Sequence, residues 1–119
     1  MLADLAAGLS TGVATVQRYG KAHVGHKTMV DALAPAADAL ARRAAAGADP
    51  ADALDAAAEA ARAGAEATRD TVARRGRASY VGEVARGVVD PGAAAAALML
   101  ACAAHAAGGS IGPAAFRFD

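Results

Sequence analysis

The stretch ARRGRASYVGEVARGVVDPGA, from Ala73 to Ala93, determines how this chain is organised. It is the only long segment that is neither alanine-rich nor helically periodic, and it carries three glycines ahead of an Asp-Pro-Gly turn. Alanine- and leucine-rich segments stand on both sides of it. We therefore expect packed helices that hold a loop, and loops on rigid scaffolds commonly carry function.

The composition indicates a single all-α domain over residues 1–119. Alanine is the best helix former, whereas the Val, Ile and Thr runs typical of strands are scarce. Aromatic residues make up only 3% of the chain and tryptophan is absent, so the core must consist of small side chains with helix axes close together. The 12 basic residues balance the 12 acidic ones, which gives no general attraction to nucleic acid.

Two features bear on where the protein works. The single cysteine, Cys102, excludes an internal disulfide and fits a reducing cytoplasm. The longest apolar run, Ala93 to Ala104, is about a dozen residues long, and a bilayer span takes about 20. We read this run as a buried helix and expect no membrane partner.

Apolar spacing and capping residues predict four helices. The first covers residues 2–18, with a buried stripe at Leu2, Leu5, Leu9, Val13 and Val16. The second starts from Thr28 as N-cap, with Asp31 in a capping-box-like position and Pro35 inside, and ends near Gly47. Asp49-Pro50 starts the third, which runs to about Ala73, and Asp90-Pro91 starts the fourth, which ends at Gly108-Gly109. Residues 109–119 form an irregular tail.

If successive helices pack antiparallel, the first and third loops lie at the same end of the bundle. The N-termini of the second and fourth helices point there too and would offer free N–H groups and positive dipole ends. Together with the glycines and basic residues, these ends suggest an anion site, with phosphate as the natural ligand. The basic residues concerned are Arg18, Lys21, Lys27, Arg74, Arg75 and Arg77. The plainer alternative is a set of polar, solvated loops.

Two sequence motifs indicate a more specific fold and function. GHKTMVDALAPA (Gly25 to Ala36) and the stretch from Ala73 to Ala93 resemble the L subunit, or L domain, of dihydroxyacetone kinases. That family reads approximately GDKTM-D-L-P and A-KGRASY-GERS-G--DPGA at these places. The likeness covers the chain up to about Gly108, in the right order and spacing.

The resemblance implies an antiparallel, up-and-down helical bundle or barrel, with about four of the family's eight helices present. It implies binding of ADP or ATP with Mg²⁺ and phosphoryl transfer to dihydroxyacetone held on a separate K subunit or domain. In some versions a phosphoprotein of the phosphotransferase system recharges the bound ADP instead. The residues that match the family's nucleotide site, with Arg77 also as the catalytic residue, are Gly20, Lys27, Thr28, Met29, Arg77, Asp90, Pro91 and Gly92.

Two departures qualify this likeness. His26 stands where the family commonly has Asp, which alters the charge near the mouth of the site. The family's aspartate cluster for magnesium, D-x4-D-x-D, has no counterpart here, so the chain looks like the C-terminal half of an L domain. We therefore expect little or no kinase activity from this chain alone, and self-association through exposed apolar helix faces. The alternative is a non-catalytic interaction or regulatory protein derived from the L domain.

Other readings of the polar residues are weaker. A zinc site from His23, His26, Cys102 and His105 has the right ligand number, but Cys102 and His105 lie far along the fourth helix, and Cys102 would pack as a small buried hydrophobe. Asp49, Asp52 and Asp55 are best explained by the dipole of the third helix. Asp31 and Asp38 are expected on a solvated edge.

Overall fold

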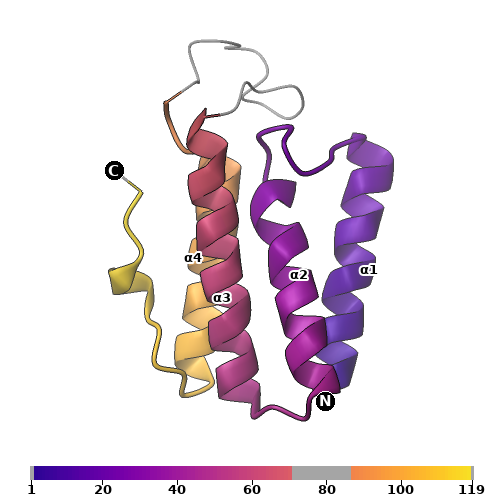
Figure 1. The fold of residues 1–119 in the computed structure, drawn as a ribbon, viewed down its shortest axis with the longest axis vertical. Coiled ribbons are helices and arrows are strands. Elements are labelled where there is room, and N and C mark those ends of the chain that lie inside the picture. Colours follow the sequence, from indigo (N-terminus) through magenta and orange to yellow (C-terminus); the bar gives the residue numbers. More distant parts are fainter. Residues whose placement is uncertain (1, 71–86, 119) are drawn as a thin grey trace.

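The structure, a computed structural model, describes residues 2–70 and 87–118, which form four α-helices. These are α1 (Leu2–Gly20), α2 (Val30–Ala45), α3 (Pro50–Ala67) and α4 (Pro91–Ala106). A 3₁₀ turn at Thr68–Asp70 continues α3, and another at Pro113–Ala115 follows α4. Successive helices run in opposite directions (Figure 1), which confirms the expected all-α, up-and-down arrangement.

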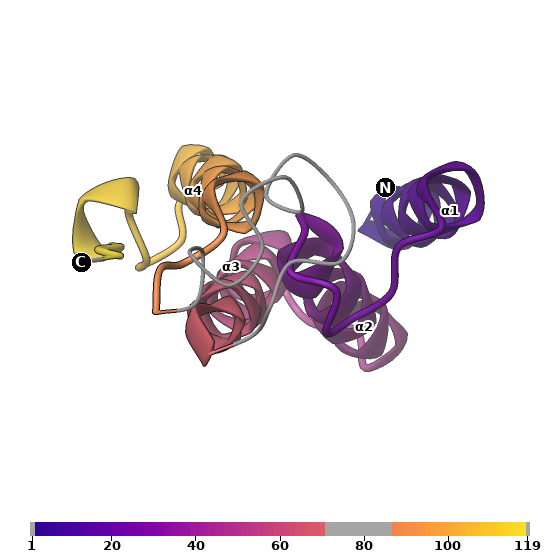
Figure 2. The same cartoon turned by 90° about the horizontal axis from the view of Figure 1, so that it is seen from above.

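The order of packing follows the order of the chain. α1 packs on α2, α2 on α3 and α3 on α4, and α4 also touches α2. Seen from above, α1 therefore stands at the edge of the assembly, well apart from α4 (Figure 2). The connection between α1 and α2, the end of α3 and the start of α4 all lie at the same end of the molecule, as predicted (Figure 1).

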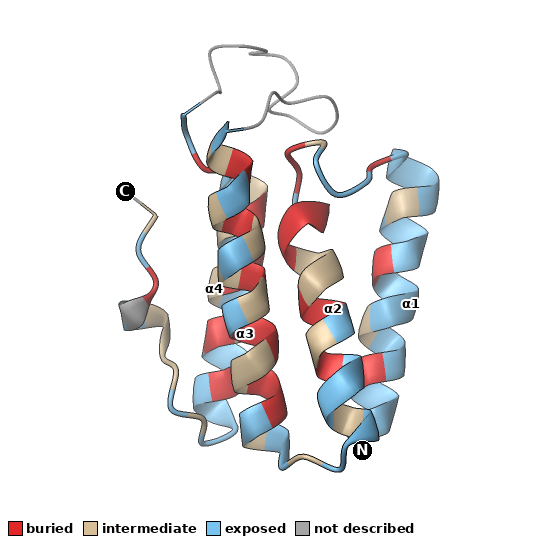
Figure 3. Cartoon of the chain, viewed as in Figure 1, coloured by how far each residue is buried: buried red, intermediate tan, exposed pale blue. Residues whose placement is uncertain are grey.

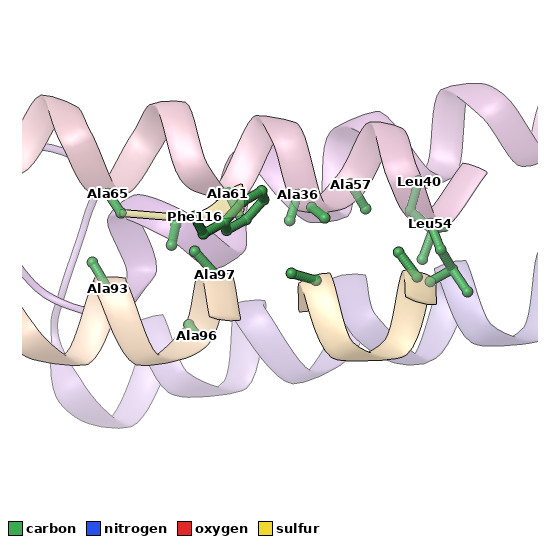
Figure 4. Close-up of a cluster of buried hydrophobic side chains, with 14 of the residues drawn as sticks. Ala36, Leu40, Leu54, Ala57, Ala61, Ala65, Ala93, Ala96, Ala97 and Phe116 are labelled. Carbon is green, nitrogen blue, oxygen red and sulfur yellow. The ribbon is translucent and has the colours of Figure 1, made fainter. Parts of the chain in front are cut away.

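The core is built largely from alanine. Ala57, Ala61 and Ala97 are fully buried between the helices, and Leu40 and Phe116 supply some of the few large side chains (Figure 4). Alanine loses no side-chain entropy in a helix and lets neighbouring backbones approach closely. This agrees with the small-residue core expected from the lack of aromatic residues.

The predicted buried stripe of α1 is only partly buried. Val13 is buried, but Leu5 is 47% exposed and Val16 is 38% exposed. The physical reason is that α1 has one main neighbour, α2, so the stripe is wider than the surface available to cover it. Most of α1 consequently faces solvent (Figure 3).

The expectation of a buried fourth helix holds only for its inner side. Ala97 and Ala101 face the core, but Met99 is 72% exposed and Cys102 is exposed as well. The helix is apolar on all sides, yet α2 and α3 cover only its inner side. Within residues 2–70 and 87–118, no helix is long and apolar enough to cross a membrane.

The helix boundaries differ from the predicted ones by a few residues. α1 continues to Gly20 and α3 ends at Ala67, with the 3₁₀ turn in place of a last α-helical turn; residues 71–73 lie outside the described range. Asp49 caps α3, since its Oδ2 accepts from Ala51 N at 3.3 Å, and Pro50 follows at the first helical position. α2 runs through Pro35 to Ala45.

The tail is better ordered than the sequence indicates. The Asp55 carboxylate on α3 accepts hydrogen bonds from Ser110 N at 2.8 Å, Ser110 Oγ at 3.1 Å and Ile111 N at 3.2 Å. Farther along, Phe116 is buried against the core. Asp55, interpreted from sequence as a helix-dipole residue, thus holds the tail on α3.

Candidate functional site at the N-termini of α2 and α4

The start of α4 is fixed by Asp90. Its Oδ2 accepts from Ala93 N at 2.9 Å, and Pro91 occupies the first turn, which confirms the predicted Asp-Pro helix start. Asp90 is only 5% exposed. Burial raises the pKa of this carboxyl above its ordinary value, although the hydrogen bond from Ala93 and the charge of Lys27 act in the opposite direction.

The start of α2 lies one residue later than predicted: Met29, not Thr28, is the N-cap, and no side chain caps the helix there. Thr28 and Asp31 instead hold the turn that leads into the helix. Thr28 Oγ1 accepts from Val30 N at 3.2 Å, and Asp31 Oδ2 accepts in return from Thr28 N at 2.9 Å. The second carboxylate oxygen of Asp31 accepts from Gly25 N at 2.6 Å. Asp31 is therefore buried, and the expectation that it lies on a solvated edge is wrong, because its carboxylate folds back onto the preceding loop.

Lys27 lies inside the molecule between these two helix starts. Its side chain is 1% exposed, and its ammonium donates to the backbone carbonyls of Thr68, at 2.6 Å, and of Val88. Its backbone adopts the left-handed conformation with φ of 61°. One residue thus connects the loop before α2, the end of α3 and the approach to α4.

Thr68 completes this connection and was not singled out from the sequence. Its hydroxyl donates to Ala65 O at 2.6 Å and accepts from Asp90 N at 2.8 Å. A threonine at the end of a helix gives no sequence signal for this role, since its partner lies 22 residues ahead. Nearby, Gly87 N donates to Arg69 O at 2.5 Å, so the chain segments on either side of residues 71–86 meet.

Met29 and Gly92 face each other across the two helix starts. A Cβ atom placed on Gly92 would lie 3.7 Å from Met29 Cβ and 3.2 Å from Asp90 Oδ2. Met29 remains 44% exposed. The result is an apolar, accessible side chain beside a helix N-terminus, where the absence of a side chain on Gly92 lets Met29 and the Asp90 carboxylate pack closely.

The structure brings together most of the predicted site residues that it describes. Lys27, Thr28, Met29, Asp90 and Gly92 are linked by the contacts given above, and Pro91 lies between the last two. Gly20 ends α1 at the same end of the molecule and has no atom within 4 Å of a Cβ placed on it. Arg77, like Arg74 and Arg75, lies outside the described residues.

The electrostatics of this end differ from expectation in one respect. The sequence suggests free N–H groups at both helix starts, but Val30 N is taken by Thr28 and Ala93 N by Asp90. Thr28 beside α2 and the capping residue Asp90 at α4 thus satisfy part of the donors that an anion would use. Arg18 and Lys21, by contrast, are exposed on the α1 side.

No metal centre is evident in the described part of the chain. Within residues 2–70 and 87–118, no group of three or more His, Cys, Asp or Glu side chains is placed to hold a metal ion. His23 and His26 pair with each other, since His26 Nδ1 accepts from His23 N at 3.1 Å and the ring centroids lie 5.3 Å apart. The weak zinc alternative gains no support.

Comparison with known proteins adds a family and a set of relatives. The family model described as the DAK2 domain matches residues 1–105. The chain is 49% identical over 99 residues to a putative 3,4-dihydroxy-2-butanone kinase of Solanum lycopersicum, which covers 82% of this chain and 17% of that protein. It is 44% identical to an L-erythrulose 1-kinase of Mycolicibacterium smegmatis, over 77% of this chain and 16% of that protein.

A shorter relative covers the same region. The chain is 38% identical to the ADP-binding subunit DhaL of PEP-dependent dihydroxyacetone kinase 2 of Listeria innocua, over 75% of this chain and 41% of that protein. The chain thus spans less than half the length of each of these curated relatives.

Proposed function

The chain belongs to the DAK2 domain family, and on this premise we propose that it forms the ADP- or ATP-binding part of a kinase for dihydroxyacetone or a similar small hydroxyketone. The names of its relatives support this class, since they include kinases of small keto sugars and an ADP-binding subunit. The transfer of the phosphoryl group to the hydroxyketone is part of the proposal.

The observation that carries the proposal is the meeting of Met29 with the Asp90-Pro91-Gly92 turn. Asp90 follows Met29 by 61 residues in the chain. In the folded structure, however, a Cβ atom on Gly92 would lie 3.7 Å from Met29 Cβ. Met29 offers an apolar, polarizable surface to a purine. The missing side chain of Gly92 lets Met29 pack against the start of α4, and a diphosphate would bind at this helix N-terminus.

We assign the other residues by the same reasoning. Gly20 leaves the end of α1 open for the nucleotide. Thr28 holds the turn around Met29 in place by accepting a hydrogen bond from Val30 N. Arg77 is proposed as the phosphate contact and catalytic residue, because a guanidinium spreads positive charge over several phosphoryl oxygens.

The described residues do not fit a magnesium site. Mg²⁺ prefers oxygen ligands, and it serves phosphoryl transfer by neutralising charge on the phosphates. Residues 2–70 and 87–118 hold no cluster of acidic side chains suited to it. We therefore propose that ligands for Mg²⁺ come from outside this chain, and that the chain alone has little or no kinase activity.

The partners follow from the same proposal. A K subunit or domain would supply the hydroxyketone, and a phosphoprotein of the phosphotransferase system could replace ATP as phosphoryl donor. The Listeria innocua relative is named as part of a PEP-dependent enzyme, which supports this second donor. We place the complex in the cytoplasm.

Calorimetric titration with ADP, with and without Mg²⁺, tests the proposal on the parent chain and on Arg77→Ala. Arg43→Ala is the matched control, because Arg43 lies in the last turn of α2, at the opposite end of the helix from Met29. Binding that Arg77→Ala weakens by about tenfold or more, and that Arg43→Ala leaves unchanged, would support the nucleotide site. A folded parent chain that binds no ADP would favour the non-catalytic alternative.

A further inference from the structure

The most unusual polar group in the described residues is the ammonium of Lys27. Lysine is almost never fully buried without compensation, because a charge loses its hydration energy inside a protein. Here the side chain is 1% exposed, and the backbone is held at a left-handed φ of 61° that is unfavourable for a residue with a Cβ. The fold retains the buried ammonium and the left-handed backbone, although burying an apolar side chain at this position would carry a smaller desolvation penalty.

The partners of Lys27 show what the burial achieves. Its Nζ donates to Thr68 O at 2.6 Å and to Val88 O. Lys27 is two residues before Met29, and Val88 is two residues before Asp90. The bond to Val88 therefore joins the two segments that form the proposed nucleotide contact, and the bond to Thr68 joins both to the end of α3.

Two buried acids, Asp90 and Asp31, lie near this charge. The charge of Lys27 favours the ionised form of Asp90, whereas the charge of Asp31 opposes it. Asp90 in turn caps α4, and Asp31 holds the loop that leads to Lys27. Removing the ammonium would leave two carbonyl oxygens without this donor. It would also leave the repulsion between the Asp31 and Asp90 carboxylates without an opposing charge.

We propose that Lys27 is a positioning residue: its buried ammonium fixes the spacing between Met29 and the Asp90-Pro91-Gly92 turn, and it does so without itself touching the nucleotide. This inference rests on the proposed nucleotide site. It differs from the family motif's implication that Lys27 is a direct contact, since the ammonium already binds two backbone carbonyls inside the molecule.

The test compares Lys27→Met with Arg43→Met. Methionine keeps the length of the lysine stem but has no charge and no donors. Arg43 is the control, because it is an exposed basic residue in the last turn of α2, at the opposite end of the helix from Met29. Two readouts are needed: the dissociation constant for ADP, and amide hydrogen exchange at Asp90 and Ala93 without nucleotide.

We expect Lys27→Met to weaken ADP binding by about tenfold or more and to speed exchange at Asp90 and Ala93 by a similar factor. Exchange at Ala57 and Ala61 in the middle of α3 should change less, and Arg43→Met should stay near the parent in both readouts. Loss of ADP binding with unchanged exchange at Asp90 and Ala93 would mean a direct contact and would overturn the proposal, as would unaltered binding.

Chemical rescue keeps the test decisive if Lys27→Met does not fold. In a Cys102→Ser background, Lys27→Cys can be aminoethylated in denaturant and refolded, which restores an ammonium on a side chain of nearly the same length. Recovery of slow exchange and of ADP binding supports the proposal, and a refolded chain that recovers neither contradicts it. If the parent chain binds no ADP, the proposed function fails, while exchange at Asp90 and Ala93 still decides the role of Lys27.

Discussion

Gly64 on α3 packs directly against the turn of α2 that contains Pro35. A Cβ atom on Gly64 would lie 2.9 Å from Pro35 Cγ and 2.0 Å from the carbonyl oxygen of Asp31. Pro35 has no N–H to donate to that carbonyl, four residues back in the helix. The two central helices therefore approach closely at the point where α2 lacks a backbone hydrogen bond, just below the proposed site.

This packing makes Gly64→Ala a sensitive substitution. Alanine is the better helix former, but its methyl group would overlap the backbone of α2, so we expect a loss of about 2–4 kcal/mol in the free energy of unfolding. Urea denaturation followed by circular dichroism measures it. Gly12→Ala in α1 is the control, since nothing lies within 4 Å of its added Cβ, and it should gain up to about 1 kcal/mol. Equal effects at both positions would contradict the close approach.

The Asp55 carboxylate should make attachment of the tail dependent on pH. Hydrogen bonds from Ser110 and Ile111 lower its pKa below the ordinary value of 3.8. Because the pKa is lower in the folded state, the stability that the ionised Asp55 carboxylate contributes is present above pH 3.8. It is lost as the pH falls through the pKa of Asp55 in the folded state. NMR signals of Ser110 and Ile111 should therefore shift only in strong acid.

Asp55→Asn supplies the comparison for that titration. The amide can still accept a hydrogen bond but does not titrate in this range. The acid-dependent shift of Ser110 and Ile111 should disappear in this variant, while Asp52→Asn, an exposed position one turn earlier, should leave it intact.

Asp90 should show the opposite pH behaviour. Burial raises its pKa above 3.8 in the folded state, so the folded chain binds the proton more tightly than the unfolded one. The contribution of this proton to stability is complete below pH 3.8 and is lost as pH rises through the folded pKa. Asp90→Asn keeps an oxygen to cap Ala93, and the stability of the parent relative to this variant should fall as pH rises across that range. If the stability of the parent relative to Asp90→Asn rose with pH instead, the raised pKa of Asp90 would be contradicted.

Exposed apolar side chains on the two outer helices predict self-association. Leu5 and Val16 on α1 and Met99 on α4 are exposed. No charged residue lies between Leu5 and Gln17 or between Pro91 and Ala104.

Sedimentation velocity should show association of the parent that Met99→Glu weakens by about tenfold or more. Ala63→Glu, at an exposed position on the central helix α3, should have little effect. A monomeric parent at all concentrations would contradict this prediction.

Local sequence signals were sufficient for the helices and for the Asp-Pro starts of α3 and α4. Asp49-Pro50, Asp90-Pro91 and the pairing of Thr28 with Asp31 all act through hydrogen bonds within a few residues, so the sequence contains both partners side by side. The motif residues Met29, Asp90 and Gly92 could also be identified, together with the antiparallel order that brings them to one end.

What only the tertiary structure decided depends on partners far apart in the chain. The burial of Lys27 requires carbonyls from Thr68 and Val88, the role of Asp55 requires the tail, and the exposure of Leu5 and Met99 reflects which helix faces find a neighbour. Periodicity marks a side as apolar but does not say whether another helix covers it. A long-range hydrogen bond leaves no spacing in the sequence, because its geometry exists only after the helices have packed.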